Sequence, residues 1–252
     1  IAITGSVGKT TVKEMVASIL SQLGNVLFTQ GNFNNQIGVP LTLLRLTPAH
    51  DFAVIELGAN HPGEIAYTTG LTNPDVTLIN NVAAAHLEGF VDLHGVARAK
   101  VEIFTHSGEN AIAVLNCDSD YTDYWLRRLE QRPVLRFSMD AAKEVDVWVK
   151  NIQLDAFGCA TFTIYHKQQS SIETVEVTLS SPGRHNVNNA LAAAGVCLSV
   201  GASLADIASG LSQMKPVNGR VNLIKLSDHL TVIDDTYNAN VESAKAAIDL
   251  LA

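Results

Sequence analysis

The chain has 252 residues, of which 47% are hydrophobic and 17% charged, with a formal net charge of -8 and a sequence pI near 5.4. This length and composition allow a sizeable core in one large or two smaller domains. The acidic balance excludes an extended basic face for nucleic acid, and no apolar stretch reaches membrane-spanning length. The cysteines, Cys117, Cys159 and Cys197, are scattered, which fits a reducing cytoplasm and no disulfide framework.

The first 140 residues alternate between expected strands and helices. Residues 1–3 form a short apolar strand, and from Lys9 the apolar spacing becomes helical up to Gly24. Further strands are predicted in DFAVIELG, PDVTLINNV, NAIAVLN and PVLRFS, with helices in LHGVARAKVEIF and SDYTDYWLRRLEQ. This alternation implies right-handed crossovers and an α/β fold, in which helices flank a mostly parallel sheet.

The pattern changes from about Val145. VDVWVKNIQLD, CATFTIYH and ETVEVTL alternate with period two, which predicts a small antiparallel β-sheet over residues 145–180. Helices follow in SPGRHNVNNALAAAGVCLSVG and SLADIASGL, the second with Ser203 and Asp206 spaced for a capping box. After the linker-like KPVNGR, two strands are expected in VNLIKL and LTVIDDTY, and then a helix.

These patterns predict a central domain over residues 1–217 and the start of a second α/β domain over residues 218–252. Ile1 already lies inside an expected strand, and the chain stops inside an expected helix. We therefore expect a fragment that is cut at both ends.

The loop TGSVGKTT after the first strand has the context of a phosphate-binding loop (P-loop). Amides at a helix N-terminus face an anion, a lysine reaches the outer phosphates and a hydroxyl ligates Mg²⁺. The common spacing wants a glycine at Ile3, whereas this chain has Gly5. The alternative is a Gly-rich turn with a surface lysine. The strand before and the helix after favour a phosphate site made by Gly5, Ser6, Val7, Gly8, Lys9, Thr10 and Thr11, with Thr10 on the metal.

TGSVGKTT resembles the P-loop of the Mur ligases, the ATP-dependent amide ligases of peptidoglycan synthesis. TQGNFNNQIGVPLTLL resembles the branch of this family that joins D-Ala-D-Ala to UDP-N-acetylmuramoyl-tripeptide. VIELGANHPGEI, NNVAAAHLEGF, ARAKVEIF, PGRHNVNNALAA and DDTYNANVESAKAAI continue the match in the family's order over nearly the whole chain. The resemblance implies a bacterial, cytoplasmic, monomeric enzyme using ATP and two Mg²⁺ ions. Family members also carry an N-terminal UDP-binding domain, which we expect to be absent here.

In this family ATP phosphorylates a carboxylate, and an amine then attacks the acyl phosphate, leaving ADP and phosphate. Such a site must neutralise charge on both reacting groups, which suits hard cations with oxygen ligands. Glu56 ends a strand, where the strand ends of open α/β sheets face the ligand crevice. The resemblance implies that Glu56 is a Mg²⁺ ligand, whereas the plain alternative is an exposed carboxylate.

His86 and Lys100 become candidates only through the resemblance, which implies a catalytic role for both together with Lys9. It assigns His86 to the second magnesium, although a lone histidine is more often structural and Mg²⁺ prefers oxygen. It also implies that CO₂ carbamoylates Lys100 and so creates an anionic metal ligand, whereas charge alone predicts a solvated helix lysine.

The remaining site residues are likewise assigned by resemblance. Asn186 and Asn189 share a helix face, and the resemblance favours Asn189 for adenine and Asn186 nearer the phosphates, although Asn186 could simply cap the helix. Arg220 resembles the linker arginine that reaches the nucleotide, and Asp235 resembles the carboxylate that holds the ribose. The loop after the first helix is either an ordinary tight loop or a contact for the muramoyl-peptide through Thr29, Asn32, Asn34 and Asn35.

Three other functions are weighed against this one. Another Mur ligase or a folylpolyglutamate synthetase-like ligase is disfavoured by NFNNQIGVP and DDTYNAN. A P-loop kinase or GTPase is a different class of enzyme, and a GTPase needs a guanine-reading Asn-Lys-x-Asp stretch, which does not occur. A non-catalytic nucleotide-binding subunit predicts nucleotide binding without hydrolysis that depends on substrates.

Overall fold

The computed structural model describes the whole chain except residues 85–86, 130, 216, 218, 228–229, 238–243, 246, 249 and 251–252. The described strands are β1 (Ala2–Thr4), β2 (Val26–Phe28), β3 (Phe52–Glu56), β4 (Val76–Ile79), β5 (Ile112–Asn116), β6 (Val134–Ser138), β7 (Val147–Leu154), β8 (Cys159–Lys167), β9 (Ile172–Pro182), β10 (Asn222–Ser227) and β11 (Leu230–Asp234). The described helices are α1 (Lys9–Leu20), α2 (Gly38–Leu43), α3 (Glu64–Thr72), α4 (Leu87–Phe90), α5 (Leu93–Lys100), α6 (Glu102–Thr105), α7 (Thr122–Leu129), α8 (His185–Ser199) and α9 (Leu204–Gln213).

The first six strands form a parallel sheet in the order β2-β3-β1-β4-β5-β6. β1 lies between β3 and β4, so that Ala2 pairs with Ile55 on one side and Thr77 on the other. The predicted alternation of strands and helices is confirmed. The carboxyl ends of β1, β3 and β4 therefore meet at one edge, where a ligand site is expected in open α/β sheets.

The antiparallel strands predicted from period-two alternation are confirmed, and they continue the parallel sheet. β7 pairs with β6 in parallel, with Phe137 opposite Val147, and β8 and β9 then add in antiparallel order. The described strands β1–β9 thus form one nine-stranded sheet. The paired apolar residues at the β6–β7 join, Phe137 and Val147, are fully buried in the same core cluster.

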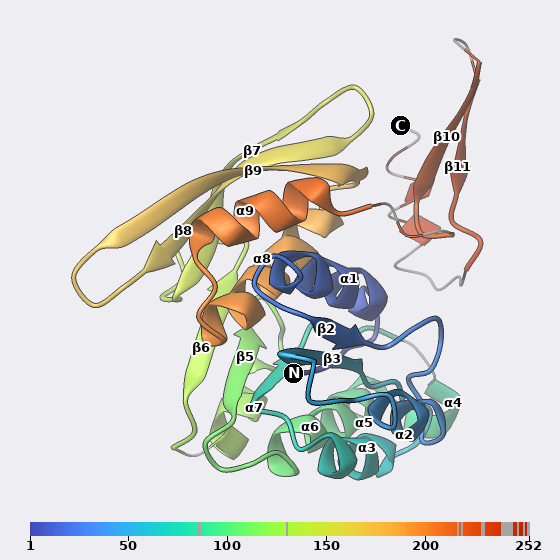
Figure 1. Cartoon of the computed structure of the whole chain (residues 1–252), viewed down its shortest axis with the longest axis vertical. Coiled ribbons are helices and arrows are strands. Elements are labelled where there is room, and N and C mark those ends of the chain that lie inside the picture. Colours follow the sequence, from blue (N-terminus) through green and yellow to red (C-terminus); the bar gives the residue numbers. More distant parts are fainter. Residues whose placement is uncertain are drawn as a thin grey trace.

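Helices cover both faces of the parallel sheet (Figure 1). α1, α8 and α9 pack on one face, and α2, α3 and α5–α7 lie on the other. Successive strand residues enter different cores: Leu78 and Val114 join the cluster under α1 and α8, whereas Ile79 and Leu115 join the cluster with Trp125 of α7. Strands covered on both faces read as continuous apolar runs, which is why β4 and β5 lack polar alternation.

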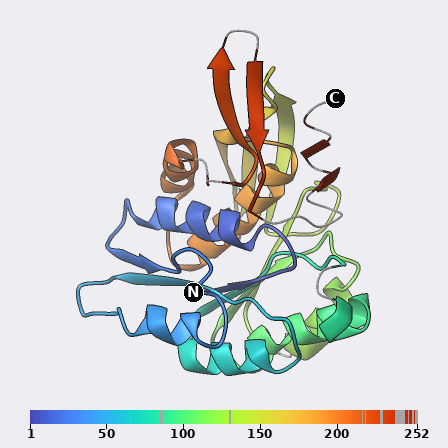
Figure 2. The same ribbon diagram turned by 90° about the vertical axis from the view of Figure 1, so that its right-hand side faces the viewer.

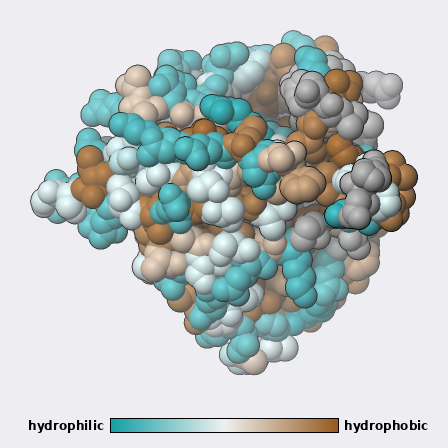
Figure 3. Space-filling view, turned by 90° about the horizontal axis from the view of Figure 1, so that it is seen from above, coloured by the Kyte–Doolittle hydropathy of each residue, from teal (hydrophilic) through white to brown (hydrophobic). Residues whose placement is uncertain are grey.

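The segment after α9 forms a separate two-stranded antiparallel sheet, β10–β11, which projects beyond α1 (Figure 2). Seen from above, this end of the molecule has hydrophilic and hydrophobic residues intermixed (Figure 3). The predicted capping box of α9 is present, because the Ser203 and Asp206 side chains each bond the other's backbone amide. None of the described helices is both long and apolar enough to cross a membrane.

Candidate functional site

A cavity of about 1160 Å³ lies at the carboxyl ends of β1, β3 and β4. It is lined by segments far apart in the sequence: the P-loop, the ends of β3 and β4, α5, the start of α8 and the segment after α9. It brings together these predicted site residues: Gly5, Ser6, Val7, Gly8, Lys9, Thr10, Thr11, Asn32, Asn34, Asn35, Glu56, Lys100, Asn186, Asn189, Arg220 and Asp235. Thr29 lies beneath it, fully buried, and His86 lies outside the described residues.

The P-loop connects β1 to α1 through a turn that requires glycine at one position. Gly8 has a φ of 78°, and a Cβ there would lie 2.5 Å from Asn189 Oδ1 and 2.8 Å from Asn80 Nδ2. A side chain would therefore meet both strain and a clash. The first amides of α1 have no partner within the helix and open toward the cavity end of β1, as an anion site needs.

Asn81, just after β4, forms hydrogen bonds with Ser6 and Val7 of the P-loop. Its Oδ1 accepts from the Ser6 amide at 3.1 Å and the Val7 amide at 2.9 Å, and its Nδ2 donates to the Val7 carbonyl at 2.9 Å. The sequence analysis missed this residue. The available signal was a pair of asparagines directly after a buried strand, where an amide can serve both donors and acceptors of a neighbouring loop.

A relay of buried asparagines runs from the P-loop to the end of β9. Asn80 Nδ2 donates to the Val7 carbonyl and to Asn189 Oδ1, both at 3.1 Å. Asn189 Nδ2 donates to Asn186 Oδ1 at 3.0 Å, and Asn186 Nδ2 donates to the Pro182 carbonyl at 2.7 Å. The relay fixes the start of α8 against the P-loop. Asn186 does not act as the N-cap, since Arg184 occupies that position.

Lys9 folds back over its own loop. Its Nζ donates to the Gly5 carbonyl at 2.8 Å and also contacts the Ser6 carbonyl at 3.4 Å. Burial lowers the pKa of this amine, the Glu56 carboxylate opposes that shift, and Arg220 adds to it. The lysine is thus held beside the loop amides, within the same cavity wall.

Glu56 is a buried carboxylate with one unpartnered oxygen. Its exposed fraction is 1%, and Oε1 accepts from Asn34 Nδ2 at 2.8 Å. Oε2 is buried and has no hydrogen-bond partner among the described residues. An uncompensated buried charge is costly. The donor set therefore fits a cation at Oε2 and does not fit the exposed carboxylate that the plain alternative required.

Lys100, at the end of α5, is buried rather than solvated, with 3% of its side chain exposed. Burial and the neighbouring Lys9 charge lower its pKa to about 7, against the opposing carboxylates of Glu102, Glu56 and Glu64. A neutral amine is therefore accessible at neutral pH. Within the described residues, no three His, Cys, Asp or Glu side chains cluster to hold a metal by themselves.

The segment after α9 closes over the P-loop through Arg220. Its Nη2 donates to Thr10 Oγ1 at 3.1 Å, and its guanidinium lies 4.2 Å from the Tyr237 ring centroid. Asp235 Oδ1 accepts from the Val221 amide at 3.2 Å. These contacts place Arg220, which is predicted to bind the nucleotide, beside the Thr10 hydroxyl, which is predicted to ligate the metal. Asp235 lies in the same segment.

The asparagine-rich loop after β2 borders the acidic end of the cavity. Thr29 Oγ1 accepts from the Glu56 amide at 3.0 Å, and the Asn34 carbonyl accepts from the Gly58 amide at 2.7 Å. Asn35 Oδ1 accepts from the backbone amides at the start of α2. The loop is therefore more than an ordinary turn, since its side chains hold Glu56 and line the cavity.

Comparison with known proteins gives consistent matches. The family model described as the Mur ligase middle domain matches residues 3–197. The chain is 53% identical over 252 residues to UDP-N-acetylmuramoyl-tripeptide--D-alanyl-D-alanine ligase of Escherichia coli K12, covering all of this chain and 54% of that protein. The same-named ligase of Mycobacterium tuberculosis H37Rv is 37% identical and is covered over 48% of its length. The chain spans about half the length of the curated relatives it matches.

Solved structures match equally well. A crystal structure of MurF from Acinetobacter baumannii has a TM-score of 0.92 and 42% identity, covering 99% of this chain and 53% of that one. MurF ligase from Thermotoga maritima in complex with ADP has a TM-score of 0.82 and 32% identity, covering 99% and 56%. The family model spans well over half of the residues and includes the P-loop, Glu56, Lys100 and the start of α8. The chain therefore belongs to the Mur ligase middle-domain family.

Proposed function

We propose that the protein carrying this chain is an ATP-dependent amide ligase that adds D-Ala-D-Ala to UDP-N-acetylmuramoyl-tripeptide. ATP would phosphorylate the tripeptide carboxylate, and the dipeptide amine would displace phosphate from the acyl phosphate, leaving ADP and phosphate. One observation carries this proposal: a single cavity brings together a P-loop, an unpartnered buried carboxylate oxygen and a lysine with a pKa near 7. The names of the relatives and the ADP complex of one of them support it.

We assign the phosphates of ATP to residues 5–11. The amides at the start of α1 would hold the phosphate oxygens, and Lys9 would turn from the Gly5 carbonyl to the outer phosphates. Arg220 is already beside Thr10, so it would contact the same phosphates. These charges would neutralise the transferring phosphoryl group, which is where most of the catalysis of phosphoryl transfer arises.

We assign Mg²⁺ to Thr10, Glu56, His86 and carbamoylated Lys100, with two ions as the family resemblance implies. The ions would neutralise charge on the phosphoryl group and on the substrate carboxylate. The buried Oε2 of Glu56 supports this assignment. Carbamoylation would join the neutral Lys100 amine to CO₂ and release one proton. The pKa of about 7 supports it, because an appreciable fraction of the amine is unprotonated at neutral pH.

We assign the adenosine to the side of the cavity formed by α8 and the segment after α9, with Asn189 at the adenine, Asn186 nearer the phosphates and Asp235 at the ribose. Both polar atoms of Asn189 are engaged by Asn80 and Asn186, so a contact from Asn189 to adenine requires one of these bonds to be exchanged. The muramoyl-tripeptide would lie along Asn32, Asn34 and Asn35, with Thr29 supporting from beneath. We propose that the protein acts as a monomer in the bacterial cytoplasm.

The test is phosphate release from ATP and Mg²⁺ by the native protein that contains this chain. UDP-N-acetylmuramoyl-tripeptide and D-Ala-D-Ala are added together and each alone, and the product is weighed by mass spectrometry. We expect release to need both substrates and to yield the pentapeptide. Lys100→Ala should abolish release, whereas Arg98→Ala, on the exposed side of the same helix, should not. If ATP binds but neither substrate stimulates release, the ligase proposal fails and a nucleotide-binding subunit takes its place.

A further inference from the structure

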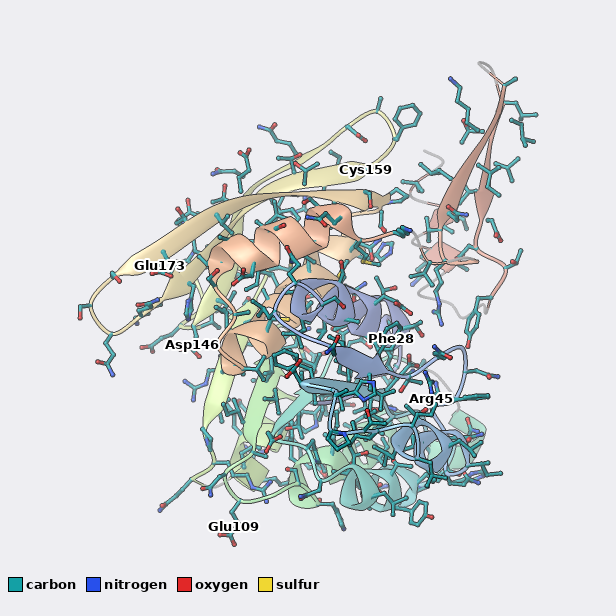
Figure 4. The ribbon with its side chains drawn as sticks, in the orientation of Figure 1. Phe28, Arg45, Glu109, Asp146, Cys159 and Glu173 are labelled. Carbon is teal, nitrogen blue, oxygen red and sulfur yellow. The ribbon has the colours of Figure 1, made fainter. Side chains whose placement is uncertain are left out.

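Lys13 is a buried cation that the proposed chemistry does not use. It lies on α1 one turn after Lys9, and its side chain is 1% exposed. Its Nζ donates to Glu14 Oε1 at 2.6 Å and to the Thr29 carbonyl at 2.7 Å. The ammonium group also lies 5.4 Å from the ring centroid of Phe28, which is on β2 beside α1 (Figure 4). An apolar side chain would fill this space without the desolvation penalty of a buried charge. The presence of a lysine here is therefore explained by the contacts of its ammonium group.

The contact with Thr29 leads directly to the cavity. Thr29 is fully buried at the point where β2 ends and the asparagine-rich loop begins. Its amide donates to the Val54 carbonyl at 3.1 Å, and its hydroxyl accepts from the Glu56 amide at 3.0 Å. Lys13 supplies the remaining contact, to the Thr29 carbonyl. Thr29 is thus held between the helix that follows the P-loop and the strand that ends at Glu56.

The loop that starts at Thr29 closes on the same carboxylate. Asn34 Nδ2 donates to Glu56 Oε1 at 2.8 Å, and the Asn34 carbonyl accepts from the Gly58 amide at 2.7 Å. A Cβ on Gly58 would lie only 3.0 Å from the Asn34 side chain, so the Asn34 side chain packs closely against the Gly58 backbone. Both ends of the loop therefore form hydrogen bonds with Glu56: the Thr29 hydroxyl with its amide and the Asn34 side chain with its carboxylate.

We propose that Lys13 is a positioning residue that fixes the Thr29–Asn35 loop and the Glu56 carboxylate relative to the P-loop. It sets the distance between the phosphate end and the acidic end of the cavity by tying α1 to the first residue of the loop. The identity of the substrate on that loop rests on the proposed function, whereas the positioning role rests on the contacts of Lys13 alone.

The experiment compares Lys13→Met and Lys13→Arg in the native protein. Methionine keeps the length of the side chain and removes the donor, whereas arginine retains charge and donors. We expect Lys13→Met to raise the KM for UDP-N-acetylmuramoyl-tripeptide about tenfold, as is typical when support of a ligand residue is lost, with little change in the KM for ATP. Lys13→Arg should recover most of the loss.

Hydrogen exchange provides a readout that does not depend on the reaction. In Lys13→Met, the amides of residues 30–37 should exchange faster, whereas those of residues 8–16 should be unchanged because Val12, Met15 and Val16 remain buried. If Lys13→Met is too unstable to purify, Thr29→Val tests the same path, because it removes the acceptor of the Glu56 amide and should give the same exchange pattern.

Ser18→Ala is the matched control. Ser18 Oγ also ties α1 to a distant carbonyl, that of Gly210 on α9 at 2.7 Å, but it does not contact the loop. It should lower stability without changing the tripeptide KM or the exchange of residues 30–37. If Lys13→Met behaves like Ser18→Ala in both readouts, the proposal is wrong. If the native protein shows no ligase activity but the exchange difference is present, the positioning role stands and the proposed function fails.

Discussion

The two ends of the cavity are built in opposite ways. At the P-loop end, Asn81 and the asparagine relay tie the loop to β4 and α8 through neutral hydrogen bonds. At the acidic end, Glu56 and Lys100 are ionisable and buried, and Oε2 of Glu56 has no hydrogen-bond partner among the described residues. The first end is already arranged to receive an anion. At the second end, the buried Glu56 carboxylate and the buried Lys100 amine destabilise the fold. A bound cation or carbamoylation of Lys100 would reduce this cost.

Glu56→Gln should have the largest effect on activity, because it removes the buried negative charge from the acidic end of the cavity. The amide keeps the shape and the contact with Asn34 but removes the negative oxygen. We expect activity of the native protein to fall about 10²–10³-fold, since metal-assisted charge stabilisation is worth several kcal/mol. Without Mg²⁺, the free energy of unfolding should not fall, because a buried charge is lost. Phosphate-release kinetics and urea unfolding measure the two quantities, and retained activity would contradict the assignment.

Asn81→Ala should loosen the end that is already ordered. The Val7 amide would lose its acceptor, which is worth about 1–3 kcal/mol when such a group stays buried, whereas the Ser6 amide would keep its second bond, to the backbone carbonyl of residue 81. We expect the KM for ATP to rise about tenfold, with a smaller change in kcat. Asn25→Ala is the control, because the Asn25 side chain makes one exposed bond to the Ala49 carbonyl. An unchanged KM for ATP would show that the P-loop keeps its shape without Asn81.

Lys100 should also change a different quantity, the pH dependence of stability. Its pKa is about 7 in the folded chain against 10.5 for an ordinary lysine, so the unfolded chain binds more protons between these values. Stability from this group therefore rises with pH from about 7 to 10.5 and is at its lowest below pH 7. We expect the free energy of unfolding to rise by about 1 kcal/mol per pH unit in this range, and this rise should be absent in Lys100→Met. Urea unfolding at pH 7, 8 and 9, free of Mg²⁺ and CO₂, compares the two slopes, and equal slopes would contradict the shift.

Local patterns were enough to predict the elements but not how they join. The strand–helix alternation and the change to period two near Val145 both correspond to observed elements. That β7 extends the parallel sheet depends on the pairing of Phe137 with Val147, which is a tertiary choice that periodicity does not contain. The domain boundary at 217–218 stays a prediction.

Site residues that belong to a sequence motif were predicted. Residues whose role depends on contacts made in the folded chain were missed. The P-loop residues follow from a strand, a Gly-rich turn and a helix. Lys13 lies about 100° from Val12 on the helix, at the edge of the apolar face, and a lysine there is ordinarily solvated. Only the placement of β2 over α1 buries it. Asn81 was missed because its partners, Ser6 and Val7, are far away in sequence.

The asparagine relay has a direction. Each Nδ2 donates toward the next residue, from Asn80 through Asn189 and Asn186 to the Pro182 carbonyl. Deamidation at Asn189 or Asn186 would replace one nitrogen by oxygen and set two acceptors about 3 Å apart. The change would affect both neighbours of either residue, because Asn189 and Asn186 each donate one hydrogen bond and accept another. The loss of one donor in this relay would therefore weaken the contact between α8 and the P-loop.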